Sequence, residues 1–297
     1  MSDWLVAPGP ASPELGEKLA KALNAETIGL EYKIFPDGEN KVRLLTEVRN
    51  RRVIVVQSTY YPADSHLMQL FLLCHKLSEE GAEVYAFIPY LAYARQDREF
   101  QKGEVISLGV LSHLLRSVGI KSLLTIDIHS TRGLGYFTFP AYSASAIPLL
   151  AQHVKKNFEL SNPLALSPDY GGQSRVQAFA KLLDLESIAL KKVRDRVSGE
   201  VTIEDNIPPL YGRDLIIVDD MISTGTSIQR ATRFLKKNGA GRIITMCTHA
   251  LLLGSALDEI LASGVEEVVA TNSVPSPASK IDVAPMIAEH YRSLESS

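Results

Sequence analysis

The chain has 297 residues, of which 45% are hydrophobic and 22% charged, and its formal net charge at pH 7 is −3. These ordinary values predict a globular protein, and the length predicts two domains with cores large enough to fold without disulfide or metal cross-links. The slight acidity argues against a nucleic-acid-binding protein, which normally needs a basic face.

Signals for a membrane or for export are not found in the sequence. No apolar run approaches the roughly 20 residues that span a bilayer. The first residues contain Asp3 and several prolines in place of a basic segment followed by an apolar one, so no signal peptide is evident. Cys74 and Cys247 lie in apolar stretches and are interpreted as core residues in a reducing compartment. We therefore expect a cytoplasmic protein.

Predicted strands and helices alternate along the chain from residue 53 onward. Apolar runs bounded by polar turns predict strands, and segments with the period of an amphipathic helix lie between them. The expected strands are 53–57, 83–88, 122–127, 163–167, 215–218, 242–247 and 267–270. The expected helices are 66–80, 106–119, 145–156, 172–183, 226–238, 256–263 and 281–292. This alternation predicts an α/β fold with mostly parallel sheets flanked by helices.

Two parts of the chain resemble each other at a nearly constant spacing. Residues 19–30 align with residues 179–190 without a gap, and six of the twelve positions are identical. Further on, residues 52–56 align with residues 214–218, each followed by a predicted helix. We infer a duplication into two similar domains. The domains are expected to span residues 1–147 and 148–297, with the alternative that the closing helix packs back on the first domain.

The second domain contains a strand, an acid pair and a hydroxyl-rich loop in succession. Asp219 and Asp220 follow the aliphatic run at 215–218, at the strand end where open α/β sheets bind ligands. The next helix opens with a loop whose N–H groups and hydroxyls suit a phosphate. Its residues are Ser223, Thr224, Gly225, Thr226 and Ser227. A sugar phosphate fits both parts, since the acids accept hydrogen bonds from sugar hydroxyls directly or through a metal. The alternative is an ordinary turn with solvated acids.

In the first copy, Gln57 and Ser58 stand where the second copy has its acid pair. The sugar-phosphate site is therefore expected in the second domain alone.

Two polar segments of the first domain have a structural and a functional interpretation. The Pro-Asp-Gly turn at 35–39 is either a plain hairpin turn or a base-binding site. In the second case Phe35 stacks, and Asp37 and Glu39 accept hydrogen bonds from an exocyclic amine such as that of adenine. The loop at 93–98 contains two arginines, which suit phosphate, but it also fits a solvated ion-pair loop.

Three further segments leave alternatives open. Asp127 and His129 end a predicted strand, whose alternation would place both on one side, and His129 either binds a metal or phosphate or is structural. Asp169 precedes a Gly-Gly turn, which is either a Mg²⁺ and anion site or a bare turn. The basic run at 191–196, before a predicted hairpin, is either a solvated edge or a mobile flap that closes over phosphates.

Neither a Walker P-loop nor a Gly-x-Gly-x-x-Gly dinucleotide motif occurs in the chain. Residues 215–227 resemble the loop shared by phosphoribosyltransferases and ribose-phosphate pyrophosphokinases. The other segments, in this order, are similar to those of the pyrophosphokinases, or phosphoribosyl diphosphate (PRPP) synthetases, from about Val6 to Pro275. The resemblance implies two phosphoribosyltransferase-like domains. It also implies a Mg²⁺-dependent reaction of ATP with ribose 5-phosphate, in which the anomeric hydroxyl attacks the β-phosphorus to give PRPP and AMP.

The resemblance also implies a role for each motif. Lys192 and Arg194 match the Lys-x-Arg of a mobile catalytic flap, which stabilises charge on the transferred group. The adenine turn with Phe35 reaches into a neighbouring subunit's site, so a homodimer or larger homo-oligomer with the ATP site near the interface is expected. The remaining matches are Phe35, Asp37, Glu39, Arg95, Gln96, Asp97 and His129 with ATP, His129 and Asp169 with Mg²⁺, and Asp219, Asp220 and 223–227 with ribose 5-phosphate.

The chain departs from the family pattern at two points. The loop at 223–227 lacks a second glycine found in many synthetases, although we expect it still to bind phosphate. Arg132 stands where many bacterial and animal members have Gln, so their control by ADP does not follow from the resemblance. Two alternatives remain: a phosphoribosyltransferase, which needs no second domain or adenine turn, and a non-catalytic regulatory subunit, which can lose the flap or the Mg²⁺ residues.

Overall fold

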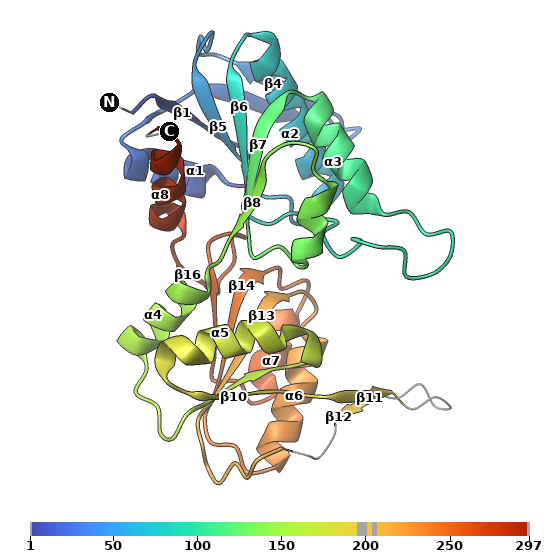
Figure 1. Ribbon diagram of the computed structural model, residues 1–297, viewed down its shortest axis with the longest axis vertical. Helices are drawn as coiled ribbons and strands as arrows, with labels where there is room; N and C mark the ends of the chain where they lie inside the picture. The colour runs from blue at the N-terminus through green and yellow to red at the C-terminus, as the bar shows by residue number, and fades with distance from the viewer. Residues whose placement is uncertain (1, 195–200, 204–206, 296–297) are drawn as a thin grey trace. The chain divides into compact units, whose positions relative to one another are not determined.

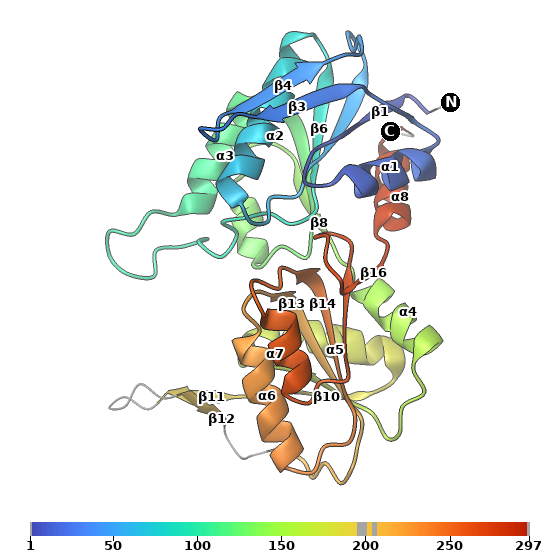
Figure 2. The same cartoon turned by 180° about the vertical axis from the view of Figure 1, so that it is seen from behind.

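The computed structural model describes residues 2–194, 201–203 and 207–295. The chain forms two compact units, of which unit 1 contains Met1–Ser145 and Asp282–Ser297 and unit 2 contains Ala146–Ile281. Each unit has a six-stranded parallel sheet with helices against it (Figures 1 and 2). No helix in the described part of the chain is long and apolar enough to cross a membrane.

Unit 1 has the strand order β2-β1-β5-β6-β7-β8, and β3 and β4 form a separate antiparallel hairpin. Its strands are β1 Trp4–Pro8, β2 Glu26–Thr27, β3 Leu30–Ile34, β4 Asn40–Leu44, β5 Arg52–Val56, β6 Glu83–Ile88, β7 Ile120–Ile126 and β8 Ala141–Ala144. Its helices are α1 Pro13–Leu23, α2 Ala63–Glu79, α3 Ser107–Ser117, the 3₁₀ turn η1 Thr131–Tyr136, and α8 Ala284–Glu295.

Unit 2 repeats this arrangement with the strand order β10-β9-β13-β14-β15-β16 and an antiparallel hairpin of β11 and β12. Its strands are β9 Leu164–Ser167, β10 Glu186–Ala189, β11 Lys192–Arg194, β12 Val201–Ile203, β13 Leu215–Ile222, β14 Ile243–Ala250, β15 Glu267–Thr271 and β16 Ser279–Ile281. Its helices are α4 Ile147–Asn157, η2 Tyr170–Gly172, α5 Gln173–Leu183, α6 Thr226–Lys237 and α7 Ala256–Ala262.

The aliphatic strands are buried because helices cover both faces of each sheet. On β13, Leu215 and Ile217 pack in a cluster with side chains of α6 and α7. Ile216 and Val218 point to the other face and pack with α4 and α5. A central parallel strand must be apolar on both sides, which accounts for the uninterrupted aliphatic run.

The predicted duplication is confirmed by local geometry as well as by strand order. Helices α1 and α5 begin and end at positions exactly matched by the alignment, and each ends in a left-handed residue, Asn24 with φ 53° and Asp184 with φ 56°. The same capping bond follows in both copies, from Ala25 N to Ala20 O and from Leu185 N to Ala180 O. Asn and Asp tolerate this conformation better than most residues.

Each predicted strand and helix is present, but the strands predicted at 215–218 and 242–247 extend to Ile222 and Ala250. The predicted strand 215–218 extends to Ile222, because β13 and β14 stay paired as far as Ile222 and Ala250. Asp219 and Asp220 therefore belong to β13 and do not follow it. The apolar run is shorter than the strand because Asp219 and Asp220 interrupt the apolar pattern while the backbone pairing with β14 continues.

The second unit ends earlier than the expected boundary at 297, because α8 packs in unit 1. Tyr291 is buried and its ring meets Trp4 at a centroid distance of 5.3 Å. Arg292 donates a hydrogen bond to the carbonyl of Ala22, at the end of α1. Helix α4, which follows β8 of the first copy, likewise packs on α5 of unit 2. The two copies have thus exchanged their last helices, which no local pattern predicts.

Truncating Tyr291 tests this exchange. Tyr291→Ala should lower the free energy of unfolding by about 3–5 kcal/mol, because it leaves a cavity beside the Trp4 ring. In hydrogen-exchange experiments, protection should fall in α1 and β1 of unit 1. Glu289→Ala, an exposed change on the same helix, is the control and should have little effect. A loss of protection confined to β13 and β14 would contradict the assignment of α8 to unit 1.

Candidate functional site

In unit 2, an arginine lies between the two acids of β13. Arg175, on α5, donates from Nη1 to Asp219 Oδ1 at 3.2 Å, and its Nη2 lies 3.5 Å from Asp220 Oδ2. The Asp220 side chain is 6% exposed and that of Asp219 17%. Asp219 Oδ1 also accepts a hydrogen bond from Asp220 N at 2.9 Å. The acid pair is therefore held in one conformation at the carboxyl end of a central strand.

The acids around Asp219 affect its pKa. Burial raises the pKa of Asp219 well above its usual value, and the charge of Asp220 raises it further. Arg175 acts in the opposite direction, while the nearby carboxylate of Asp169 adds to the increase in this pKa. A ligand that brings hydroxyl donors or a cation would relieve this repulsion.

Replacing Asp219 by Asn should stabilise the fold at neutral pH. A carboxyl whose pKa is raised by folding favours the native state only below its unfolded pKa, and this contribution is lost as the pH rises through the folded pKa. Asparagine keeps the accepting oxygen without the charge, so we expect Asp219→Asn to raise Tm at pH 7 by a few degrees. The gain should shrink as the pH falls towards 4. Thermal unfolding between these pH values is the measurement, with the exposed Asp184→Asn as control. A lower Tm for Asp219→Asn at pH 7 would contradict this account.

The loop after β13 presents the start of α6. Gly225 has φ 73°, and a Cβ there would lie 2.6 Å from Ile260 Cδ1, so glycine is required on two grounds. Helix α6 begins at Thr226 without a side-chain cap. The exposed hydroxyls of Thr224 and Thr226 lie 3.2 Å apart, and Ser223 O accepts from Leu253 N. A phosphate suits this loop, because the positive end of α6 and the hydroxyls of Ser223, Thr224, Thr226 and Ser227 can all interact with its oxygens.

The turn after β9 lies beside this loop, because β9 is the neighbour of β13 in the sheet. Ser167 Oγ donates to Asp169 O at 2.8 Å and fixes the turn. A Cβ at Gly172 would collide with Ser167 Oγ, and one at Gly171 would lie 3.2 Å from Asp169 Oδ1. The two glycines therefore leave room around a half-buried Asp169. Unit 2 thus brings Asp169 close to the acid pair, and the charge of Asp169 contributes to the raised pKa of Asp219.

The backbone of Lys192 and Arg194 forms β11. These residues pair with Ile203 and Val201 of β12, so both strands of the expected hairpin are present. The side chains of Lys192 and Arg194 and all of residues 195–200 lie outside the described part of the chain. Their role as a flap stays a prediction.

In unit 1, the turn at 35–39 is the tip of the β3–β4 hairpin. Phe35 N donates to Glu39 O at 2.8 Å, and Asp37 Oδ1 accepts from Glu39 N at 3.2 Å. Phe35 is half-buried beneath Lys33, whose Nζ lies 4.7 Å from the ring centroid, whereas Asp37 and Glu39 are exposed. The turn is thus the tip of a hairpin with two exposed acids, and its binding of adenine stays a prediction.

The loop at 93–98 is anchored on its inner side and exposed on its outer side. Asp97 is buried, and its carbonyl accepts from Tyr136 Oη at 2.8 Å. Arg95 and Gln96 are exposed, although Gln96 Oε1 accepts a hydrogen bond from Ser107 Oγ. Of the three predicted ATP residues in this loop, Arg95 and Gln96 are exposed and Asp97 is buried.

His129 is exposed, but it does not lie on a strand. Strand β7 ends at Ile126, because Asp127 adopts a left-handed conformation with φ 36°. The expected alternation of Asp127 and His129 on one side of a strand is therefore wrong. The turn is instead fixed by hydrogen bonds from Asp127 N to Ala144 O and from Ile128 N to Ser143 Oγ.

Comparisons with known proteins identify the family of the chain. A sequence model of the N-terminal domain of ribose phosphate pyrophosphokinase matches residues 5–119, and one of the phosphoribosyl synthetase-associated domain matches residues 187–295. A ribose-phosphate pyrophosphokinase of Sulfurisphaera tokodaii is 38% identical over 290 residues, which cover 96% of this chain and 99% of that protein. The chain belongs to the ribose-phosphate pyrophosphokinase family.

The likeness to this family extends over nearly the whole chain. The family member of Methanopyrus kandleri is 38% identical over 283 residues, covering 95% of this chain and 96% of that protein. The structure of phosphoribosylpyrophosphate synthetase from Mycobacterium smegmatis matches with a TM-score of 0.90 and 27% identity, covering 99% of both chains. The family and the α/β fold predicted from the sequence are confirmed, and the chain is an enzyme of this pyrophosphokinase family.

Because the fold is duplicated, unit 1 contains a strand end equivalent to the one that carries the acid pair in unit 2. There Gln57, Ser58 and Thr59 are buried. Gln57 Oε1 accepts from Ala11 N at 3.0 Å, and Ser58 Oγ accepts from Tyr90 N at 3.1 Å. The first copy thus uses these side chains for internal hydrogen bonds, which supports a sugar site in unit 2 alone.

Arg175 is the residue of this site that sequence reasoning missed. It is the cation of the segment 167–175, but its effect on acids 44 and 45 positions later depends on β9 lying beside β13. A cation that follows a Gly-Gly turn after a strand would have been the signal.

Proposed function

We propose that the protein transfers the β,γ-diphosphoryl group of ATP to the anomeric hydroxyl of ribose 5-phosphate, giving PRPP and AMP. The observation that carries this proposal is the acid pair near the carboxyl end of β13, followed directly by a hydroxyl-rich loop at the start of α6. Membership of the ribose-phosphate pyrophosphokinase family supports it.

The sugar phosphate binds in unit 2. The loop at 223–227 holds the 5-phosphate at the start of α6. Asp219 and Asp220 accept hydrogen bonds from the ribose hydroxyls, and Arg175 keeps the two carboxylates in place. This arrangement orients the anomeric hydroxyl for attack, and such positioning is a large part of catalysis in phosphoryl transfer.

The nucleotide binds to residues of unit 1. Phe35 stacks on the adenine, while Asp37 and Glu39 accept from its exocyclic amine. Arg95, Gln96, Asp97 and His129 serve the rest of ATP, Arg95 through a guanidinium that suits phosphate oxygens. The exposure of Arg95, Gln96 and His129 supports this part of the proposal.

Mg²⁺ is the proposed cofactor, with Asp169 and His129 as its protein residues. No group of three or more His, Cys, Asp or Glu side chains in the described ranges is placed to hold a metal. This fits Mg²⁺, which usually takes one or two carboxylates and completes its shell with water and substrate phosphates. The acidic charge around Asp169 and Asp219 also fits a cation. When bound, the metal neutralises phosphate charge.

Lys192 and Arg194 are the proposed catalytic residues. As side chains of a flap over the substrates, they would stabilise the negative charge that develops on the transferred group.

Two cysteines that are buried and unpaired, Cys74 and Cys247, support our proposal that the enzyme works in the reducing cytoplasm.

We also propose a homodimer or larger homo-oligomer in which the Phe35 turn completes the ATP site of a neighbouring subunit. The Phe35→Ala and Lys192→Ala variants should each be nearly inactive. When the two are mixed and allowed to exchange subunits, about half of the dimers contain one subunit of each kind, and one of the two sites in such a dimer is intact. The mixture should therefore recover about a quarter of wild-type activity. Each variant exchanged with itself is the control. A mixture no more active than the mean of its components would mean that each subunit contains its own site.

The reaction is tested by ³¹P NMR of the protein with ATP, Mg²⁺ and ribose 5-phosphate. AMP and a sugar-linked diphosphate should appear only when the sugar is present. ATP that stays intact, with and without added phosphate, would favour a non-catalytic regulatory subunit. Consumption of PRPP with a purine base, and no reaction with ATP, would favour a phosphoribosyltransferase.

A further inference from the structure

Tyr93 has an unusual backbone conformation at the start of the 93–98 loop. Its φ is 64°, in the left-handed region, which for a bulky residue costs about 1–2 kcal/mol. Such a conformation persists only where the surroundings hold it. Tyr93 stands two residues before Arg95, so what holds Tyr93 also directs the loop.

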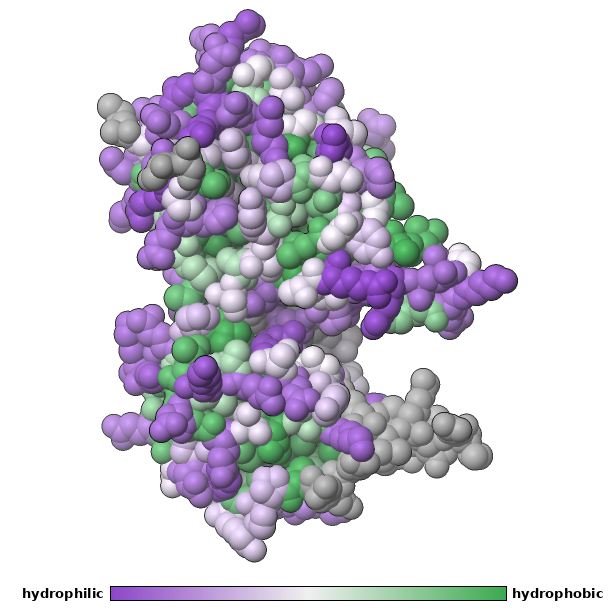
Figure 3. Space-filling model, in the orientation of Figure 1, coloured by the Kyte–Doolittle hydropathy of each residue, from purple (hydrophilic) through white to green (hydrophobic). Residues whose placement is uncertain are grey.

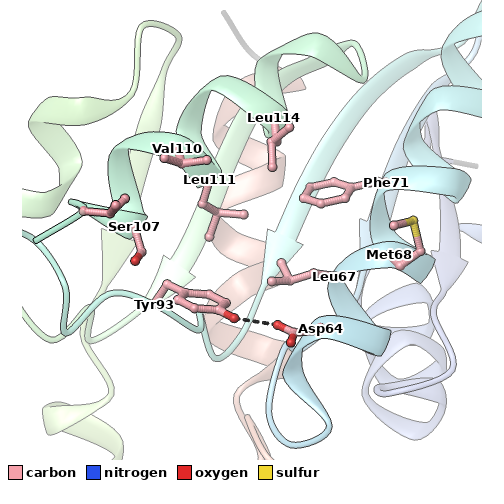
Figure 4. Close-up of a pocket in the computed structure, with 10 residues that line it drawn as sticks. Asp64, Leu67, Met68, Phe71, Tyr93, Ser107, Val110, Leu111 and Leu114 are labelled. Atoms are coloured by element: carbon pink, nitrogen blue, oxygen red, sulfur yellow. Dashed lines mark hydrogen bonds between the residues drawn. The ribbon is translucent and has the colours of Figure 1, made fainter.

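The side chain of Tyr93 is held between two helices. Its ring lines an apolar groove of about 350 Å³ between α2 and α3, together with Leu67 and Leu111, and the residue is 39% exposed (Figure 4). Its hydroxyl donates to Asp64 Oδ1, in the first turn of α2, at 2.5 Å. This hydrogen bond to a carboxylate raises the pKa of Tyr93. Exposed apolar side chains such as Val105 and Val110 give this part of unit 1 an apolar surface (Figure 3).

The backbone of the loop turns directly on Tyr93. Gln96 N donates to Tyr93 O at 3.0 Å, which closes the turn from which Arg95 extends. Just before it, Ala92 N donates to Thr59 Oγ1 at 2.8 Å, at the end of β5. The loop is thus attached at Ala92 to Thr59, which follows β5, and at Tyr93 to α2, while Arg95 and Gln96 are exposed.

We propose that Tyr93 is a positioning residue, whose hydrogen bond to Asp64 holds the loop in the conformation that presents Arg95 and Gln96 to ATP. This inference rests on the proposed nucleotide role of the loop. Without this hydrogen bond, one interaction that offsets the conformational energy of the left-handed Tyr93 is lost. The loop is then less ordered before binding, and part of the binding free energy of ATP is used to order it. Affinity for ATP falls, and affinity for ribose 5-phosphate, held by unit 2, does not.

The test is calorimetric binding of ATP with Mg²⁺, without the sugar, and separately of ribose 5-phosphate. Tyr93→Phe should weaken ATP binding about fivefold, the worth of one hydrogen bond, and leave sugar binding unchanged. Asp64→Ala should do the same, and Asp64→Asn, which keeps an accepting oxygen, should restore most of the affinity. The double variant Tyr93→Phe/Asp64→Ala should be no weaker than either single variant, because both remove the same bond.

Tyr85→Phe is the matched control, since Tyr85 also donates to a carboxylate, Glu83 Oε2, at 3.5 Å in the same unit. It should leave both affinities unchanged. Unchanged ATP affinity in Tyr93→Phe, or equal weakening for ATP and sugar, would overturn the inference. Wild-type protein is first tested for formation of AMP from ATP and ribose 5-phosphate. An inactive wild type refutes the proposed function, whereas an active wild type with an unaffected Tyr93→Phe refutes only the role of Tyr93.

Discussion

Replacing Lys192 by Ala should lower kcat at least a hundredfold while the dissociation constants of ATP and ribose 5-phosphate stay within about threefold. The reason is that a flap cation interacts with charge that develops only in the transition state, so its loss raises the barrier and leaves ground-state binding intact. Rapid-quench turnover and calorimetry of each substrate are the measurements.

Lys181→Ala is the control for this variant, since Lys181 is an exposed lysine of α5 in the same unit. It should leave kcat unchanged. A near-normal kcat in Lys192→Ala would remove Lys192 from the catalytic residues, and a large loss of ATP binding with unchanged kcat would make it a binding residue.

Replacing Asp220 by Asn should weaken binding of ribose 5-phosphate by about 10- to 100-fold, as expected for hydrogen bonds to a charged acceptor. The side chain is nearly fully buried and in contact with Arg175, so the substitution also leaves this guanidinium with less opposing charge. The affinity for ATP, whose proposed residues lie in unit 1, should change little. Calorimetric titration with each substrate separates the two effects.

Asp184→Asn makes the same chemical change at an exposed position of unit 2. The equivalent residue of unit 1 is Asn24, which has the same left-handed backbone conformation, so asparagine fits this position. The control should therefore bind both substrates normally. Unchanged sugar affinity in Asp220→Asn would refute the role of the acid pair.

The duplication gives the two proposed substrate-covering segments equivalent positions. The adenine turn at 35–39 is the tip of β3–β4, and Lys192 and Arg194 belong to β11 of the β11–β12 hairpin. Both hairpins lie between the second and third strands of their copy. The equivalent hairpins thus differ in sequence, with an aromatic and two acids in one copy and a basic pair in the other.

The central strand ends diverged in a similar way. In the first copy, Gln57, Ser58 and Thr59 form internal hydrogen bonds and stabilise the unit. In the second, Asp219 and Asp220 occupy the equivalent end and carry a raised pKa at Asp219. Buried charge is costly for stability, which supports the proposed sugar site at this strand end.

The order of elements, the duplication and the motifs were readable from local patterns. Periodicity and turn residues depend on neighbours within a few positions, which is why the strand at 83–88 is found exactly where it is predicted. The Gly225 loop was readable for the same reason, since its glycine is required by the backbone conformation at that residue.

Contacts between distant segments needed the tertiary structure. Arg175 reaches the acid pair only because β9 and β13 are neighbours, and β13 continues past its apolar run only because β14 pairs with it. Helix α8 has the apolar stripe of any surface helix, and its sequence does not say that Trp4 and Ala22 will cover it. A local pattern specifies that a face must be buried, whereas the partner that buries it is chosen by the packing of the whole chain.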